Sequence, residues 1–216
     1  MQEIPIEIVI EIFNLLDLKS QLKMNSLCKM FQQKMFITNL FNIENKYLNL
    51  LSDNIISQTK YHKIEKLNAS YNSSIHDVSH MKNLKILYAE GNSGIDQKGI
   101  QNLDLVELSA LYNPKIKDVS HMNNLKILYA YGNSGIDQKG IQKLDLIELN
   151  ASNNPSIKDV SHMKNLKILY AEGNSGIDQR GIQNLDLIEL YTLFNHSIKD
   201  ISHMKNLKIH NYNRIK

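Results

Sequence analysis

The stretch LKILYAEGNSGIDQKGIQNLDLVELSALYNPKIKDVSHMNN, residues 84–124, occurs three times in this sequence with few changes. Its next copies begin at Leu125 and Leu166, so the repeat is 41 residues long. Each copy divides into two related halves with the pattern L-x-x-L-x-A-x-x-N-x-x-I, spaced alternately by 20 and 21 residues. A regular period of this length is typical of a solenoid, whose units are stable only when they stack on their neighbours.

Extending this frame predicts eight coils of 20 or 21 residues over residues 64–216. Their first core positions are Ile64, Leu84, Leu105, Leu125, Leu146, Leu166, Leu187 and Leu207. The pattern resembles the leucine-rich repeat, whose core reads L-x-x-L-x-L-x-x-N-x-L. The resemblance implies a right-handed α/β solenoid with a parallel sheet of about eight strands on its concave face. The sequence departs from that family in two ways: Ala (or Thr192) holds the third core position, and the last apolar residue falls one place later.

The L-x-A segment of each coil alternates as a strand does. In the second coil, Leu87 and Ala89 should point inward, whereas Ile86, Tyr88 and Glu90 should point outward. Stacked coils would place these strands about 4.8 Å apart. The return legs alternate between IDQKGIQNLDL in even coils and IKDVSHMKNL in odd coils, and the Asp of each would cap a short helical or 3₁₀ turn.

An asparagine follows each strand, where the chain turns out of the sheet. Its amide can donate to and accept from the backbone of neighbouring turns, so we interpret this column as structural. Removing one should leave backbone groups without partners, at a cost of about 1–3 kcal/mol. The column consists of Asn72, Asn92, Asn113, Asn133, Asn154, Asn174 and Asn195.

Composition describes a protein of 216 residues that is 42% apolar, with a net charge of +3 and one cysteine. This length is sufficient to bury a sizeable core. The scattered lysines do not favour nucleic acid as a partner, and a single Cys28 predicts a reducing compartment. The acidic N-terminus is unlike a secretory signal, and no stretch is long and apolar enough to span a membrane. We therefore expect a cytoplasmic protein, with the nucleus left open.

The first 35 residues lack the repeat and read IPIEIVIEIFNLLDLKSQLKMNSLCKMFQQKM from Ile4. Pro5 would begin a helix and Ser20 could cap a second, giving three short helices whose small core leaves apolar surface for a partner. The segment resembles an F-box, whose pattern runs L-P-x-E-I, L-D, L and V-C-x-x-W, with Ile4 and Phe31 replacing Leu and Trp. This resemblance implies docking on a Skp-type adaptor through Ile4, Pro5, Ile8, Leu16, Leu22, Leu27 and Phe31. The alternative is an unrelated helical cap for the solenoid.

These patterns divide the chain into an F-box at 1–40, a helical linker and N-terminal cap at 41–63, and repeats at 64–216. Residues 36–62 are apolar and rich in Asn, which predicts one or two helices that close the solenoid. The last coil has His210, Tyr212 and Ile215 at its expected core positions. It is either a minimal cap or an exposed, adhesive edge.

Comparison of the three copies locates a candidate binding surface. Core positions hardly change, whereas outward strand positions and the turns after them vary, and tyrosines recur there. Tyrosine is a favoured interface anchor. The predicted target-binding face consists of Tyr88, Glu90, Ser109, Leu111, Tyr112, Tyr129, Tyr131, Asn150, Ser152, Tyr170, Glu172, Tyr191, Leu193 and Phe194. The alternative is drift on an exposed sheet that favours aromatic residues.

Other regular columns do not favour catalysis or metal binding. The histidines His80, His121, His162 and His203 recur once per 41 residues, which places them two coils, or about 10 Å, apart. Zinc ligands lie about 2 Å from the ion, so these histidines cannot share one. The repeated Asp77, Asp118, Asp159 and Asp200 fit capping, and the Glu107, Glu148 and Glu189 column fits a solvated edge. We expect no enzyme, metal or cofactor.

Together the two resemblances imply a substrate-recognition subunit of an SCF-type cullin–RING ubiquitin ligase. The F-box would bind a Skp-type adaptor and through it a cullin, while the repeats would bind a target protein. The near-identical repeats, rich in Asn, Ile and Lys, are similar to F-box and repeat proteins of large DNA viruses, which implies a host-directed role. One alternative is a binding module that sequesters the adaptor or a partner without ubiquitin transfer. Another is an enzyme, which would need a cluster of unlike reactive groups.

Overall fold

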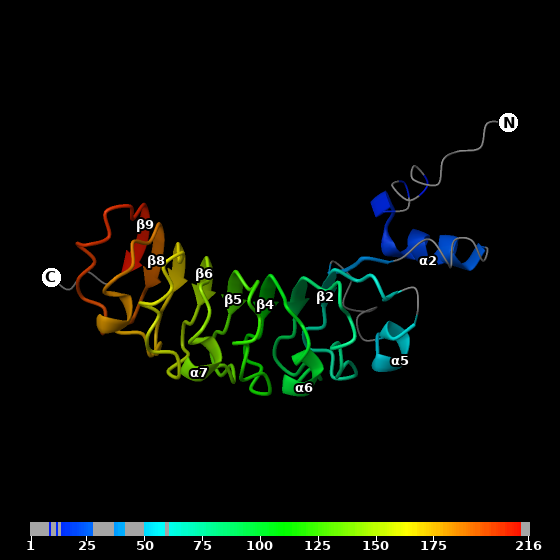
Figure 1. The fold of residues 1–216 in the computed structure, drawn as a ribbon, viewed down its shortest axis with the longest axis horizontal. Helices are drawn as coiled ribbons and strands as arrows, with labels where there is room; N and C mark the ends of the chain where they lie inside the picture. Colours follow the sequence, from blue (N-terminus) through cyan, green and yellow to red (C-terminus); the bar gives the residue numbers. More distant parts are fainter. Residues whose placement is uncertain are drawn as a thin grey trace.

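The structure, a computed structural model, describes residues 9, 12, 14–27, 37–41, 50–58 and 61–212. Nine parallel strands form one sheet in sequence order (Figure 1). Each strand after the first pairs with the strand of the preceding coil. The strands are β1 (Asn39–Leu40), β2 (Lys66–Asn68), β3 (Ile86–Tyr88), β4 (Glu107–Ser109), β5 (Ile127–Tyr129), β6 (Glu148–Asn150), β7 (Ile168–Tyr170), β8 (Glu189–Thr192) and β9 (Ile209–Tyr212).

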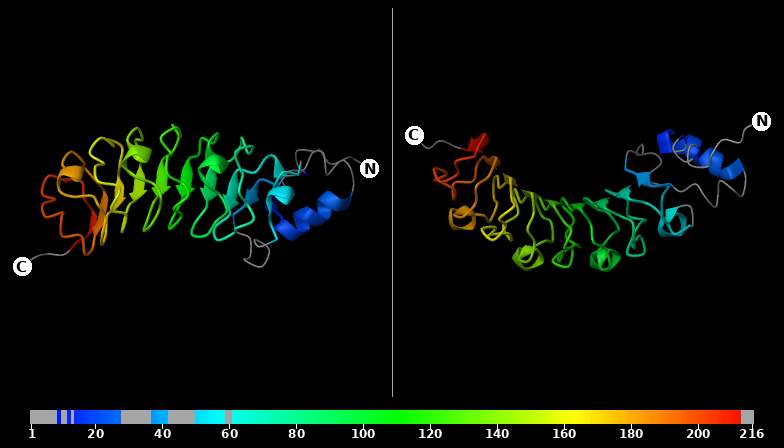
Figure 2. Two further views of the ribbon diagram at one scale, coloured as in Figure 1. Left: turned by 90° about the horizontal axis from the view of Figure 1, so that it is seen from below. Right: turned by 45° about the horizontal axis from the view of Figure 1, so that its top comes forward.

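The solenoid is curved, and the sheet lies on its concave side while the return legs lie on the convex side (Figure 2). Helical structure in these legs is short. It consists of α6 (Gln97–Ile100), α7 (Gln138–Ile141) and the 3₁₀ turn η2 (Arg180–Ile182). The predicted parallel sheet is therefore confirmed, with all eight coil strands present as β2–β9.

The core is one continuous stack of layers, in which two kinds of coil alternate. Leu87 of β3 and Ala89, just after the strand, are fully buried, as are Ile95 and Ile100 of the leg that follows. Register places Leu87 beside Leu67 and Leu108, so that each inward leucine covers the next along the solenoid. Because every inner coil has a neighbour on both sides, apolar surface that one coil alone would expose is removed from water.

The asparagine column behaves as predicted only in odd coils. The Asn113 amide is buried and donates to the carbonyl oxygens of Ala89 and Ile95, at 2.7 and 3.2 Å. The same bonds recur at Asn154 and Asn195. The column prediction is wrong for Asn92, Asn133 and Asn174, which are exposed. In the second coil the buried polar residue of the turn is Ser93 instead.

The aspartates of the return legs cap as predicted. Asp96 Oδ1 accepts the N–H groups of Lys98 and Gly99 at 2.9 and 3.1 Å, which satisfies the free donors at the start of α6. Asp118, in the odd leg, accepts from the Ser120 N–H at 2.9 Å and forms a turn without a helix. One residue type thus serves both kinds of leg.

Sheet pairing begins before the repeat frame. Strand β1 pairs with β2, so the sheet starts inside the segment predicted as 1–40, and Ile37 and Leu40 belong to the core. The short helix α5 (Asp53–Ile56) then contributes Ile56 to the same core. At the other end, β9 places His210 beside Leu190 of β8.

The N-terminal segment is described in part. Helix α2 (Leu18–Leu27) is preceded by Asp17, whose carboxylate accepts from the Ser20 N–H at 3.0 Å. Asp17 is therefore the capping residue, and the prediction of Ser20 was wrong. The other two predicted helices lie largely outside the described residues. Within the ranges that are described, no helix is long and apolar enough to cross a membrane.

Replacement of Asn113 by alanine should lower stability by about 1–3 kcal/mol, because two buried carbonyl groups lose their donor. The exposed Asn133 occupies the equivalent position in the next coil and provides the control, with an expected change within about 0.5 kcal/mol. Thermal and urea unfolding of both alanine variants measure the difference. Equal losses at the two positions would contradict the alternating role of the column.

Candidate protein-binding face

The outward side chains of the sheet form three rows across the strands, which we call the sheet face. The first row contains Ile86, Glu107, Ile127, Glu148, Ile168 and Glu189; the middle row contains Tyr88, Ser109, Tyr129, Asn150, Tyr170 and Tyr191. The third row, two residues further along each coil, contains Glu90, Leu111, Tyr131, Ser152, Glu172 and Leu193. The structure therefore brings the predicted target-binding residues together on one surface, with Tyr112 and Phe194 at its rim.

Aromatic rings contact one another along this face. Tyr88 lies edge-on to Phe41, with ring centroids 4.5 Å apart, and also faces Tyr129 at 6.4 Å. Tyr170 and Tyr191 stack at 4.5 Å with an angle of 7° between their planes. Such contacts hold the rings in place, so a partner would meet a preorganised surface at little cost in side-chain entropy.

Two of the predicted face residues are buried and support others. Ser109 donates from its hydroxyl to Glu90 Oε1 at 2.7 Å, and Ser152 accepts the Glu172 N–H at 3.0 Å. Their side chains position the acidic residues of the third row. Any contact of these serines with a partner would pass through Glu90 and Glu172.

The glutamates of the first row were interpreted wrongly as a solvated edge. They are half-buried within the sheet face and hydrogen-bond to tyrosines. The Tyr88 hydroxyl donates to Glu107 Oε1 at 2.6 Å, and the Tyr191 hydroxyl donates to Glu189 Oε2 at 3.0 Å. Their outward register with Ile86 is the signal in the sequence that could have placed them here.

Burial and charge perturb ionisation on this surface. Burial raises the pKa of Tyr88 and of Tyr129 well above the ordinary phenol value, with neighbouring glutamates adding to the effect. Burial also raises the pKa of Glu148, reinforced by the negative charges of Glu107 and Glu189 and opposed by a hydrogen bond from Tyr129. The three carboxylates of the first row thus repel one another across the isoleucines between them.

The rim of the sheet face contains bulky residues in the left-handed region of backbone space. The φ angles are 59° at Tyr71, 53° at Tyr112, 55° at Asn153 and 64° at Phe194. Tyr71 and Phe194 are about two-thirds exposed, at 65% and 66%. A bulky residue with positive φ is strained, and such strain concentrates at functional positions. These exposed rings extend the aromatic surface beyond the three rows.

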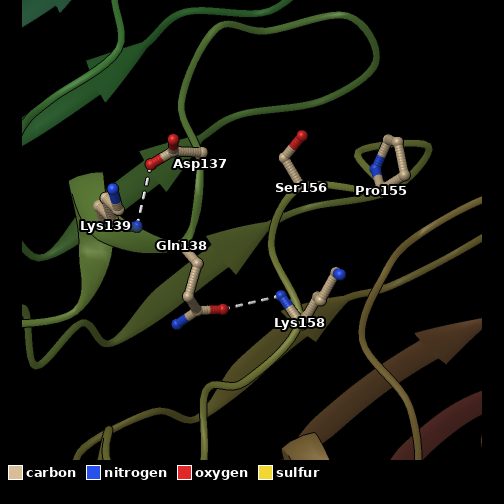
Figure 3. Close-up of a pocket in the computed structure, with 6 residues that line it drawn as sticks. All are labelled: Asp137, Gln138, Lys139, Pro155, Ser156 and Lys158. Carbon is tan, nitrogen blue, oxygen red and sulfur yellow. Dashed lines mark hydrogen bonds between the residues drawn. The ribbon is translucent and has the colours of Figure 1, made fainter.

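A shallow pocket lies on the convex side, beside α7 (Figure 3). Its lining residues are Asp137, Gln138, Lys139, Pro155, Ser156 and Lys158. The Gln138 side chain accepts the N–H groups of Lys158 and Asp159 at 2.9 and 2.8 Å, which bridges two coils. Gln97 and Gln179 make the same bonds in the other copies, so the pocket is built from repeated structural contacts that the sequence analysis missed.

The histidine column lies on the convex side, away from the sheet face. His121 and His203 contact carbonyl oxygens of the preceding coil, those of Ile100 and Ile182, at 3.4 and 3.3 Å. Among the residues that the structure describes, no group of three His, Cys, Asp or Glu side chains could hold a metal ion. His121 and His203 are therefore structural contacts between coils.

The Glu148→Gln variant should be more stable than the parent at pH 7 and equal to it near pH 4. A raised pKa means that folding disfavours the charged form, so the parent loses stability as pH rises through the folded pKa. The expected gain in Tm at pH 7 is about 1–2 °C. Glu65→Gln, at an exposed position outside the sheet face, is the control. A gain that persists at the acidic pH would exclude ionisation as its cause.

The Tyr112→Asn variant should keep the stability of the parent within about 0.5 kcal/mol, whereas Tyr112→Val should lose roughly 1–3 kcal/mol. Asparagine tolerates positive φ, as Asn153 does at the equivalent position, and a β-branched residue does not. Both variants remove the ring that faces Tyr131 at 5.1 Å, so their difference isolates the backbone. Urea unfolding measures it, and equal stability of the two would show that the turn is unstrained.

Comparison with known proteins does not assign the chain to a family. No family model matches the sequence, and no curated protein matches it significantly. What the chain does must therefore be argued from the sheet face, from the exposed N-terminal residues and from the sequence patterns themselves. Those features are the basis of the proposal that follows.

Proposed function

We propose that this chain is a protein-recognition subunit of an SCF-type ubiquitin ligase, with the sheet face as its target-binding surface. The observation on which this mainly rests is the sheet face, where tyrosines and glutamates of six successive strands meet in register. Rigid aromatic side chains with polar tips are typical of protein interfaces. The chain itself would act by binding and proximity, and catalysis would lie in other subunits.

The adaptor-binding half of the proposal rests on the F-box-like sequence. Of its seven predicted contact residues, Ile4, Pro5, Ile8 and Phe31 lie outside the described residues, and Leu27 is described only as part of α2. Leu16 and Leu22 are partly buried, and Leu22 packs against the core. Close by, Ile12 and Leu15 are 48% and 86% exposed. Exposed apolar side chains of this kind favour a surface that a partner covers.

Affinity purification from cells should recover a Skp-type adaptor and a cullin with the intact chain. It should recover neither with a chain that lacks residues 1–36, a boundary that retains β1 and its pairing with β2. Mass spectrometry identifies the recovered proteins. Adaptor without cullin would support sequestration in place of ubiquitin transfer, and no adaptor at all would refute the F-box assignment.

The same purification tests the sheet face. Tyr129→Ala combined with Tyr131→Ala should keep the adaptor and lose the target proteins, because Tyr129 ends β5 and Tyr131 follows it, near the centre of the face. Lys117→Ala, at an exposed convex position, is the control and should lose nothing. Unchanged target recovery with the tyrosine variant would place the target site elsewhere.

The proposed location of the protein is the cytoplasm, of a host cell if the viral resemblance holds, or the nucleus.

A further inference from the structure

The sheet face is acidic, although the chain as a whole has a net charge of +3. From β3 to β8, the three outward rows contain no Lys, Arg or His. Their five carboxylates belong to Glu90, Glu107, Glu148, Glu172 and Glu189. Among the described residues none of these carboxylates forms an ion pair, since the one that the structure contains there joins His76 to Asp53. Positive charge is thus absent from these rows between β3 and β8, and in the same register it appears at Lys66 of β2, beside Ile86.

The first-row carboxylates have a regular spacing. Glu107, Glu148 and Glu189 occupy the same register position on alternate strands, β4, β6 and β8. Two strand spacings amount to about 9.6 Å. A segment in the polyproline-II conformation has three residues per turn and rises about 3.1 Å per residue, so its side chains recur on one side about every 9.3 Å, whereas those of a β-strand alternate between two sides. A polyproline-II segment crossing the strands would therefore bring every third side chain to a carboxylate.

Tyrosines flank these carboxylates and suit a cation. Tyr88 and Tyr129 donate their hydroxyl protons to Glu107 and Glu148, which orients the carboxylates while leaving their charge in place. The rings of the middle row offer aromatic faces within reach of a bound ammonium or guanidinium group. Burial raises the pKa of Glu148 and repulsion by Glu107 and Glu189 adds to the effect; positive charge between the carboxylates would relieve that repulsion.

The nearest regular cations do not neutralise the face. Lys85, Lys126 and Lys167 lie one residue before the first row, at the border of the sheet. None of them pairs with a carboxylate within the described ranges. They border the acidic rows on one side only, so three lysines offset part of the negative charge of the five glutamates.

We propose that the sheet face binds a cationic segment of its protein partner in the polyproline-II conformation, with Lys or Arg at every third residue, lying across β3 to β8. This inference rests on the proposed function, since it specifies the chemistry of the target that the face would hold. It makes no use of the F-box, so adaptor recovery and peptide binding can succeed or fail independently.

The test uses the purified full chain and fluorescein-labelled peptides, with binding followed by anisotropy. The probe repeats Lys-Thr-Thr, so that its lysines match the spacing of the carboxylates. A second peptide has the same composition with its lysines consecutive, and a third has Glu in place of Lys. We expect the first peptide to bind several-fold more tightly than the second, and the third not to bind. Equal affinity of the two lysine peptides would refute the proposed spacing of one cation every third residue. Binding of the third peptide would refute the proposal that the ligand is cationic.

Two triple variants with equal charge changes identify the surface. Glu107→Gln, Glu148→Gln and Glu189→Gln together should weaken the probe about tenfold, as three partly exposed charge pairs are lost. Asp118→Asn, Asp159→Asn and Asp200→Asn remove the same charge from convex turns, where the asparagine Oδ1 can still accept the backbone N–H. This control should change affinity less than twofold. Equal weakening by both variants would show non-specific attraction, and circular dichroism checks that both are folded.

Discussion

The left-handed turn that ends each strand is the constraint on which the solenoid depends. Two residues after the inward Ala or Thr, the backbone takes a positive φ in every coil from the first to the seventh. The residues at this position are Tyr71, Gly91, Tyr112, Gly132, Asn153, Gly173 and Phe194. The turn redirects the chain from the sheet into the return leg, so one conformation repeated at one position keeps all the strands in register.

The alternation at this turn explains why the repeat has 41 residues and not 20. A Cβ atom added at Gly132 would lie 2.5 Å from Cε1 of Tyr112, and Tyr71 covers Gly91 in the same way. A large side chain in an odd coil therefore requires glycine in the even coil that follows. The odd coils also provide the buried asparagines, and the Asn113 carbonyl accepts the Gly135 N–H at 3.0 Å. Two unlike coils are thus the smallest unit that stacks.

Period and polarity were sufficient to predict the strands, the inward Leu87 and Ala89, and the Asp96 cap, because each depends on residues close in sequence. They were insufficient where a residue's surroundings are set by the neighbouring coil. Asn92 and Asn113 occupy the same place in the pattern, yet only Asn113 lies against carbonyl groups of the preceding coil. The prediction for Glu107 failed for a related reason. Its surroundings come from Tyr88 on the adjacent strand, and a sequence read one coil at a time does not contain that contact.

The regular repeat of the solenoid also limits how well its sheet face could select one register of a bound segment. The first row, with its glutamates on alternate strands, fixes the spacing of a bound segment but by itself would allow the segment to slide by one repeat. The seventh coil breaks this symmetry, since Tyr191 replaces the Ser or Asn of the other odd coils and stacks on Tyr170. There Glu189 accepts a hydrogen bond from the Tyr191 hydroxyl of its own strand, whereas Glu107 accepts one from the Tyr88 hydroxyl of the neighbouring strand. A partner on the proposed surface would therefore be held in a single register by the β8 end, where Tyr191 alters the surroundings of the first-row glutamate.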